Sequence, residues 1–429
     1  MTALFGLAAR SAWHRRGTLA LVTLSIALAT LLLLTLERMR EDIRAGFSQA
    51  VSGTDLVVGA RTGPVQLLLH AVFRIGGATN SVSMASLERV AEHRAVAWMV
   101  PLALGDSHRG YPVLGTTPAY FEHFRYGDKR PLALAQGRAF AGTLDGLYEV
   151  VLGAEVASAL GYALGSRITL THGLPSSGDA AALAATHADK PFAVVGILAR
   201  TGTPVDRTAH VSLQAIEAIH LDWAGGAPLP GVKIAPEEAR KFDLQPKKVT
   251  AALLGLKSRV AVFAVQRHVA EFEAEPLMAV LPGVALDELW QIVGVGERAL
   301  LAMSGIVALV SLAGLVSVVL AGLNERRREL AVLRAVGAAP RHVLVLLLLE
   351  GLLVTLAGAL LGAVASLVLV AAAGPWVQAM FGLNLSAWSF GPAQALLLAA
   401  VVGAGMLAAL APAWRAYRLS LADGLAPRS

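Results

Sequence analysis

Residues 299–349 read ALLAMSGIVALVSLAGLVSVVLAGLNERRRELAVLRAVGAAPRHVLVLLLL. The part from Ala299 to Leu323 carries no charge. As an α-helix it would rise about 37 Å, enough to cross a hydrocarbon layer of about 30 Å. A basic segment, 324–341, follows at once, and a second apolar run begins at His342. This pattern predicts two membrane-spanning helices joined by a short arginine-rich connection.

Two more apolar runs bring the number of predicted spans to four. The run 19–36 is uncharged and would rise about 27 Å as a helix. ERMRED follows it where a signal peptide would have a small-residue cleavage site, so we expect an uncleaved anchor. The other spans are 342–373, which contains one acid, Glu350, and 393–413.

The position of the arginines predicts the orientation. They follow the second and fourth spans, whereas the loop 374–392 has no charge: Arg326, Arg327, Arg328, Arg334, Arg341, Arg415, Arg418 and Arg428. Positive residues collect on the cytoplasmic side of short membrane loops. We therefore expect a multi-pass protein of the inner membrane whose N- and C-termini are cytoplasmic. Its predicted segments are 1–36 (N-terminus and first span), 37–298 (extracytoplasmic domain with helical stalks), 299–323, 324–341 (coupling segment), 342–373, 374–392, 393–413 and 414–429 (tail).

The composition excludes several classes of protein. Of the 429 residues, 55% are apolar and 15% are charged, against about 25% charged in an ordinary soluble protein. This composition argues against a purely soluble enzyme and excludes a disordered chain. The chain has no cysteine, so thiolate metal sites and cysteine nucleophiles are absent. The net charge of +6 comes with arginines at the ends of spans, and we expect no nucleic-acid partner.

The segment 37–298 has the pattern of an α+β domain. Short apolar runs ending in glycine predict buried strands, a short helix precedes the Gly161–Gly165 turn, and 173–191 is expected to be a flexible loop. The predicted strands are 55–60, 111–115, 150–153, 167–171, 192–198 and 260–265. Residues 37–52, and those from Leu286 onward, continue the helical pattern of the first and second spans as stalks. The predicted fold class is therefore an α-helical membrane protein with four transmembrane helices and a large α+β extracytoplasmic domain inserted between helices 1 and 2.

Motifs for independent catalysis are missing. The dipeptide Gly-Lys does not occur, so no P-loop can hold a nucleotide phosphate, and HExxH and GxSxG are absent. His172, His187 and His210 lack helical ligand spacing, and we expect surface or hydrogen-bonded residues rather than metal ligands. The acidic pairs Glu237-Glu238 and Asp287-Glu288 are expected on solvated helix faces. We predict neither a catalytic residue nor a metal site.

The connection between the second and third spans carries the main functional prediction. Its charge cluster, followed by apolar residues at helical spacing and a break at 337–340, specifies a short amphipathic helix at the cytoplasmic face. Simple anchoring by anionic lipid would not need an ordered helix.

The third span holds further candidates. Glu350 is a carboxylate within a predicted span, and its role is open between function and a structural bond. Gly358 and Gly362 form a GxxxG pair that would let another helix approach closely.

Four stretches resemble the FtsX-like permease family, the ABC-transporter subunits that include the macrolide exporter, the lipoprotein-releasing permeases and the cell-division FtsX. RRRELAVLRAVGAAPRHV (326–343) resembles the family signature, and PAWRAYRLSLADGL (412–425) resembles its ending. VVLGAEVASALGYALGSRITL (150–170) and FAVVGILARTG (192–202) resemble its periplasmic core domain. Unlike the macrolide exporter, this chain lacks a fused nucleotide-binding domain.

The resemblance implies a permease subunit that works with a separate ABC ATPase, which would bind the ATP, so that the chain itself needs no cofactor. Residues 325–338 would be the coupling helix in a groove of that ATPase. The implied contacts are Glu325, Arg326, Arg327, Arg328, Glu329 and Arg334, with Leu330 and Leu333 as apolar anchors. The other implied partners are a second permease copy or paralogue, membrane lipids, and a periplasmic adaptor or substrate-carrying protein.

Three functions remain open at this point. The first is ATP-driven export or extraction of a lipoprotein, lipid, peptide or drug by mechanotransmission. The second is regulation of a cell-wall hydrolase without cargo, as in the cell-division branch. The third, a lone membrane-anchored receptor, would need no ATPase. The size of the extracytoplasmic domain favours the first.

Overall fold

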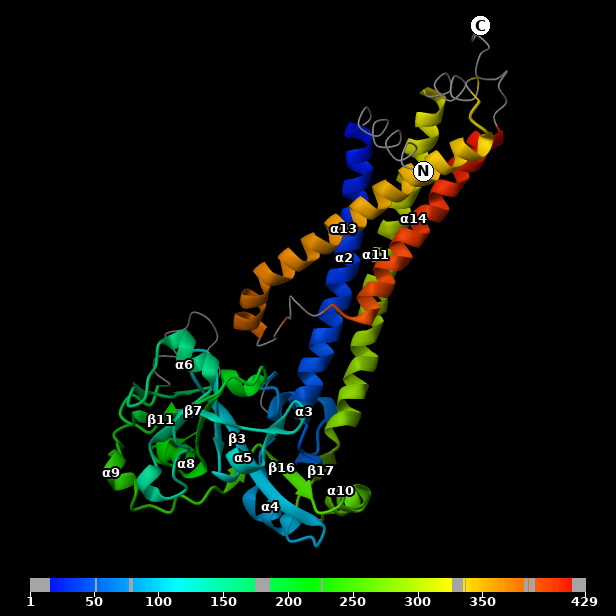
Figure 1. Cartoon of the computed structure of the whole chain (residues 1–429). Helices are drawn as coiled ribbons and strands as arrows, with labels where there is room; N and C mark the ends of the chain where they lie inside the picture. Colours follow the sequence, from blue (N-terminus) through cyan, green and yellow to red (C-terminus); the bar gives the residue numbers. More distant parts are fainter. Residues whose placement is uncertain are drawn as a thin grey trace. The chain divides into compact units, whose positions relative to one another are not determined.

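The structure, a computed structural model, describes residues 16–50, 52–76, 80–173, 186–224, 227–325, 335, 337–381, 385 and 390–418. The chain divides into two compact units. We call Arg44–Ile292 the outer domain. The remaining unit, which we call the membrane bundle, contains the described residues before Arg44, Val293–Met380 and the described residues after Asn384. Figure 1 shows both units coloured along the sequence.

Among the described residues, four long helices are apolar enough to cross a membrane, which confirms the predicted number of spans. They are α2 (Arg16–Gln49), α11 (Pro282–Glu325), α13 (Pro340–Phe381) and α14 (Pro392–Arg418). The 34 residues of α2 rise about 51 Å and the 44 residues of α11 about 66 Å. Both helices are thus longer than the hydrocarbon layer of about 30 Å that a span must cross.

The outer domain is built on a mixed sheet of eleven strands among the described residues. Nine of them lie in the order β17 (Leu277–Val280), β1 (Leu56–Ala60), β16 (Ala251–Leu256), β3 (Val96–His108), β4 (Tyr111–Thr116), β12 (Ala209–Ser212), β8 (Glu149–Leu152), β11 (Phe192–Leu198), β7 (Leu134–Gly137). The strands β9 (Arg167–Ile168) and β10 (Thr171–His172) pair with β11 and β3. Two neighbouring pairs, β4 with β12 and β8 with β11, are parallel.

Both faces of this sheet are buried in its central part, around β16. Along β16, Ala251 and Leu253 belong to one apolar cluster, whereas Ala252 and Leu254 belong to another. Successive side chains of a strand point to opposite faces, so this alternation places a core on each side. The strands therefore read as continuous apolar runs rather than as alternating ones.

Among the described residues, the outer domain has seven short helices: α3 (Pro64–Ala71), α4 (Met84–Ala91), α5 (Ala119–His123), α6 (Ala154–Leu160), α8 (Leu213–His220), α9 (Pro236–Ala239) and α10 (Val262–Ala270). Their labels mark them in Figure 1. Local sequence explains where two of them begin or end. The Ser212 hydroxyl accepts a hydrogen bond from the Ala215 amide and caps α8. Gly161, at φ +69°, ends α6 in the left-handed conformation.

One strand prediction was wrong, and another was only partly right. Residues 260–265 form a 3₁₀ turn, η3 (Arg259–Ala261), and the start of α10, because Val265 and Val269 repeat at helical spacing and are buried, while Val260 is 90% exposed. The predicted strand 167–171 is divided between β9 and β10, which pair with different partners. Of the predicted loop 173–191, residues 174–185 lie outside the described residues, and Thr186 bridges to Thr171.

Candidate functional site

The predicted coupling helix lies almost entirely outside the described residues. Glu325 is the last residue of α11, and the structure describes nothing of Arg326, Arg327, Arg328, Glu329, Leu330, Leu333 and Arg334. Gly337 has φ +103°, which favours glycine, and Pro340 opens α13. The coupling role of this segment stays a prediction.

Glu350 is buried on α13, with 4% of its surface exposed, and it has an interaction partner. A carboxylate in a spanning helix faces the bundle interior or a polar cavity when it is tolerated. Its burial agrees with that rule and leaves both roles of Glu350 open.

Gly358 and Gly362 lie where α2 meets α13. A Cβ added to Gly362 would lie 2.5 Å from the carbonyl oxygen of Ala27, and one added to Gly358 would lie 2.9 Å from that of Thr23. Nearby, the hydroxyls of Thr35 and Ser366 share a hydrogen bond of 2.9 Å between the same two helices. Small residues and interhelical hydroxyl bonds are the usual means of packing helices in lipid.

The helices α2 and α11 are also joined to each other within the bundle. Arg40 of α2 makes a 3.2 Å ion pair with Glu297 of α11 and a 3.1 Å ion pair with Glu37 of its own helix. The Ser311 hydroxyl of α11 donates to the Ser25 carbonyl of α2 at 3.3 Å.

The same two helices meet again in the outer domain. There the ring of Phe47, near the end of α2, packs edge-on against Trp290 of α11, with centroids 5.5 Å apart. Both rings pack against an apolar cluster of this domain that also contains Ala285 and Leu286. The two helices therefore contribute to the packing of each unit.

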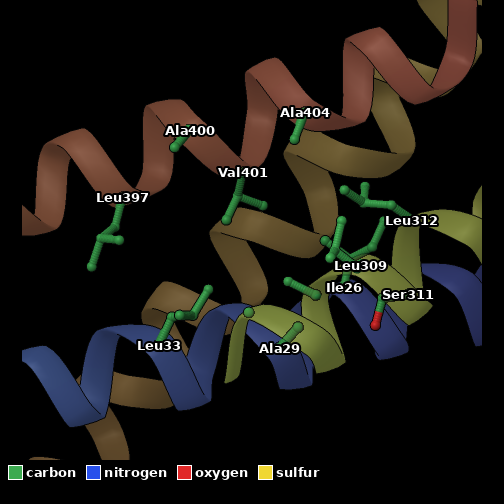
Figure 2. A pocket seen from close by; sticks show the side chains of 12 residues that line it. Ile26, Ala29, Leu33, Leu309, Ser311, Leu312, Leu397, Ala400, Val401 and Ala404 are labelled. Carbon is green, nitrogen blue, oxygen red and sulfur yellow. The ribbon is translucent and has the colours of Figure 1, made fainter. Parts of the chain in front are cut away.

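An apolar pocket of about 200 Å³ lies between α2, α11 and α14 of the bundle. Figure 2 shows side chains of the three helices converging on it. Its lining consists of Ile26, Ala29, Leu33, Gly305, Ala308, Leu309, Ser311, Leu312, Leu397, Ala400, Val401 and Ala404. The one hydroxyl among them, that of Ser311, is engaged with backbone carbonyls. The lining has no titratable group, so the pocket offers apolar contact but no acid–base chemistry.

The outer domain brings together four side chains that the sequence does not connect. They are Asp106, His172, His187 and His220, whose ligand-type atoms all lie within 4.8 Å of one another. His172 is hydrogen-bonded, as expected of a histidine of this domain. His187 differs from the expectation, because it is fully buried and neither ring nitrogen has a hydrogen-bond partner among the described residues.

Charge and burial tune this cluster. The neighbouring histidines lower the pKa of Asp106 to about 2 against the opposing effect of burial, so the carboxylate is ionised. Burial, together with the charge of His220, lowers the pKa of His187 to about 4, so this imidazole is neutral at physiological pH. No sequence motif announces the cluster, because Asp106 and His172 lie 66 residues apart.

Comparison with known families identifies the class of protein. Four helices able to span a membrane, with an α+β domain between the first and second, define the class of multi-pass membrane proteins, and two family models match the chain. The MacB-like periplasmic core domain matches residues 17–266, more than half of the chain, and the FtsX-like permease C-terminal region matches residues 301–421. The chain belongs to the FtsX-like permease family and carries a MacB-like periplasmic core domain.

Solved structures add two distant likenesses. The periplasmic region of MacB from Actinobacillus actinomycetemcomitans is 11% identical, with a TM-score of 0.34, over 57% of this chain and 97% of that one. The extracellular domain of the noncanonic ABC-type transporter YknZ from Gram-positive bacteria is 11% identical, with a TM-score of 0.30, over 53% of this chain and 99% of that one. At these scores neither adds an argument to the family match. No curated protein matches the chain.

Proposed function

We propose that the protein is the permease subunit of an ATP-driven ABC transporter, and that it passes the motion of a separate ATPase to its periplasmic domain. One observation carries this proposal. Two helices, α2 and α11, are each longer than a membrane is thick, and each runs without interruption from spanning residues to residues packed in the periplasmic core. A helix with unbroken hydrogen bonds transmits displacement along its axis, because a sharp bend would need a proline, a bulge or an inserted group.

The contacts between the two helices support the same proposal. Arg40 and Glu297 join them in the bundle, and Phe47 and Trp290 join them in the periplasmic domain. A force applied to either helix therefore also reaches the other. The force would enter at the segment 325–338, in a groove of the ATPase, when ATP brings two ATPase subunits and two permease copies together.

A helix-breaking substitution in α2 tests the transmission. Met39 is 37% exposed, and Met39→Pro would remove one backbone hydrogen bond and clash with the preceding turn. Met39→Ala is the matched control, because alanine keeps the helix. In the complex with its ATPase, we expect Met39→Pro to abolish the ATP-dependent movement of the periplasmic domain while ATP hydrolysis continues.

The absence of cysteine makes the movement measurable. A single Lys241→Cys substitution on the exposed part of the periplasmic domain can carry a spin label without background from other thiols. Distances between labels on two permease copies are then compared with and without ATP. If Met39→Pro moves as the parent does, the stalks do not transmit the motion and the proposal is wrong.

The coupling segment needs its own test. Arg327→Glu combined with Leu330→Asp reverses one charge and removes one apolar anchor. We expect the ATPase to stop co-purifying with this variant and to remain bound to the control variant Lys241→Glu. If the ATPase binds both variants equally, 325–338 is not its docking helix.

The orientation is tested with the same cysteine-free background. A membrane-impermeant maleimide added to intact spheroplasts should label Lys241→Cys, and should label Ala335→Cys only after the membrane is permeabilised.

Reconstitution with the ATPase distinguishes a transporter from a regulator. ATP-dependent release of a lipoprotein, lipid, peptide or drug supports a transporter, whereas activation of a cell-wall hydrolase without cargo supports a regulator.

A further inference from the structure

The periplasmic domain holds a cluster whose chemistry the transport proposal does not use. Four segments of the chain supply one side chain each. Asp106 lies on β3, His172 on β10 and His220 at the end of α8, and His187 directly follows Thr186, which bridges to Thr171. The strands β10 and β3 are antiparallel partners that place His172 directly opposite Asp106. Sheet pairing and helix position therefore bring the four together without any sequence motif.

Three of the four ligand atoms lie at distances close to those of a tetrahedral metal site, and all four lie within 4.8 Å of one another. Nδ1 of His172 lies 3.0 Å from Nε2 of His220 and 3.2 Å from Oδ1 of Asp106, and the last two atoms are 3.5 Å apart. Four ligands bound to zinc at about 2.0–2.1 Å in tetrahedral geometry lie about 3.3 Å from one another. Small movements of these side chains would suffice to coordinate an ion at the centre of the cluster.

His187 gives a second, independent indication. Its side chain is fully buried, yet neither ring nitrogen has a hydrogen-bond partner among the described residues, and one of them lies within 4.8 Å of the other three ligand atoms. Buried polar atoms are almost always satisfied, and each exception needs an explanation. A bound cation would accept the lone pair of this neutral imidazole.

The surroundings orient the ligands. Nδ1 of His220 contacts the Ile216 carbonyl at 2.8 Å, which holds a proton on Nδ1. Nε2 lies on the side of the cluster, 3.0 Å from Nδ1 of His172, and is the atom that would give up its proton when an ion binds. Trp223 covers the group, with its ring 4.2 Å from that of His187. The ammonium of Lys190, whose charge acts on His187, is compensated by Asp222 at 2.7 Å. A positive ion would therefore not meet an unpaired cation.

We propose that Asp106, His172, His187 and His220 form a binding site for a divalent transition-metal ion of the zinc type. Three imidazoles and one carboxylate, with no thiolate, suit Zn²⁺, Co²⁺, Ni²⁺ or Cu²⁺ rather than Mg²⁺ or Ca²⁺, which prefer oxygen ligands. Four protein ligands complete a tetrahedron, the arrangement of structural sites. The ion would clip β10 and the segment that begins at Thr186 to β3 and α8. This inference does not depend on the proposed transport function.

The experiment uses the full chain in detergent after treatment with a chelator. Zn²⁺ is titrated in competition with a chromophoric chelator, and Co²⁺ is added separately to record its visible absorption. We expect one ion per chain, an intense visible band typical of four-coordinate Co²⁺, and a higher thermal midpoint with Zn²⁺. Absence of stoichiometric binding would leave an Asp–His hydrogen-bond cluster and overturn the proposal.

Variants locate the site. His172→Gln and His187→Gln should each weaken Zn²⁺ binding by at least about a hundredfold, because each removes a direct ligand. His172 is partly exposed, so its variant remains informative if the buried His187 variant fails to fold. The matched control is His108→Gln. His108 lies two residues from Asp106, but its ring contacts the Thr169 carbonyl at 2.7 Å and the Tyr162 hydroxyl at 3.0 Å and is not one of the four ligands. Equal affinity in all three variants would mean that Zn²⁺ binds elsewhere.

Tryptophan fluorescence provides a local readout. Ni²⁺ or Cu²⁺ in the cluster should quench Trp223, one of seven tryptophans, and the quenched fraction should disappear in Trp223→Phe. Quenching that persists in Trp223→Phe places the ion at another tryptophan and contradicts the assignment.

Discussion

The membrane bundle and the periplasmic domain differ in what they expose. In the periplasmic domain large apolar side chains are inside, with Leu67, Leu87 and Leu114 completely buried. The bundle also buries an apolar cluster, but many large apolar residues of α2 and α11 are outside, and hydroxyl residues are inside, among them Thr30, Ser304 and Thr355.

The difference indicates that the surrounding solvent determines which residues are buried and which forces hold them together. In water, burial of apolar surface drives packing. In lipid that force is missing between helices, and close backbone contact with interhelical hydrogen bonds takes its place. The substitutions below test whether the two regions depend on different forces.

The largest effect is expected from the periplasmic core. Leu114→Ala, on β4, removes a fully buried side chain and should lower the free energy of unfolding by about 2–5 kcal/mol. Val260→Ala, at a residue that is 90% exposed, is the matched control and should change it little. Denaturant unfolding of the full chain, followed by circular dichroism, measures both. Equal stability of the two variants would contradict a water-driven core.

In the bundle the opposite substitution should destabilise. Gly362→Ala adds a methyl group 2.5 Å from the Ala27 carbonyl oxygen, so α2 must move, at a cost of about 1–3 kcal/mol. Gly403→Ala on α14 meets nothing within 4 Å and serves as the control. Thermal unfolding of the full chain in detergent distinguishes them. If Gly362→Ala is as stable as Gly403→Ala, close contact of α2 with α13 does not hold the bundle.

Acid should weaken the periplasmic domain through a buried histidine. Burial, and then the positive charge of Arg74, lower the pKa of His210 to about 3, against about 6.5 when unfolded. Below pH 6.5 the unfolded chain binds a proton that the folded chain does not, so stability falls as the pH falls, by about 2 kcal/mol at pH 5. The stability of His210→Gln should depend less on pH between 7 and 5, whereas the control His123→Gln should behave as the parent. An unchanged slope in His210→Gln would assign the acid sensitivity to other groups.

The smallest effect compares one kind of hydrogen bond in both regions. Thr116→Val removes a donor to the buried Pro101 carbonyl in the periplasmic domain and should cost about 1–3 kcal/mol. Thr35→Val removes the bond to Ser366 between α2 and α13 and should cost only about 0.6 kcal/mol. The two thermal midpoints of the full chain measure the difference, and a larger loss for Thr35→Val would reverse the comparison.

Sequence reasoning worked best where a pattern is long and local. The four spans, and the strands at 56–60, 111–116 and 192–198, follow from uninterrupted apolar runs. It failed at 260–265, where a short apolar run fits a strand or a helix, and only the burial of Val265 and Val269 in the tertiary structure chose the helix. The GxxxG motif at Gly358 and Gly362 predicted that another helix packs closely against α13. The sequence did not indicate that this helix is α2.

The Asp106–His220 cluster was beyond the reach of sequence reasoning. His172 and His220 are 48 residues apart, and their proximity depends on the pairing of β10 with β3 and on where α8 ends.

By itself the sequence determined which segments of this protein suit lipid and which suit water. The free energy of transferring a helical segment from water to the bilayer depends on the composition of some twenty residues and needs no knowledge of the fold. Only the tertiary structure decided which helix lies on the glycines of α13 and which carboxylate and imidazoles share one small volume. Contacts between distant segments are set by the packing of the whole domain, and no local pattern records them.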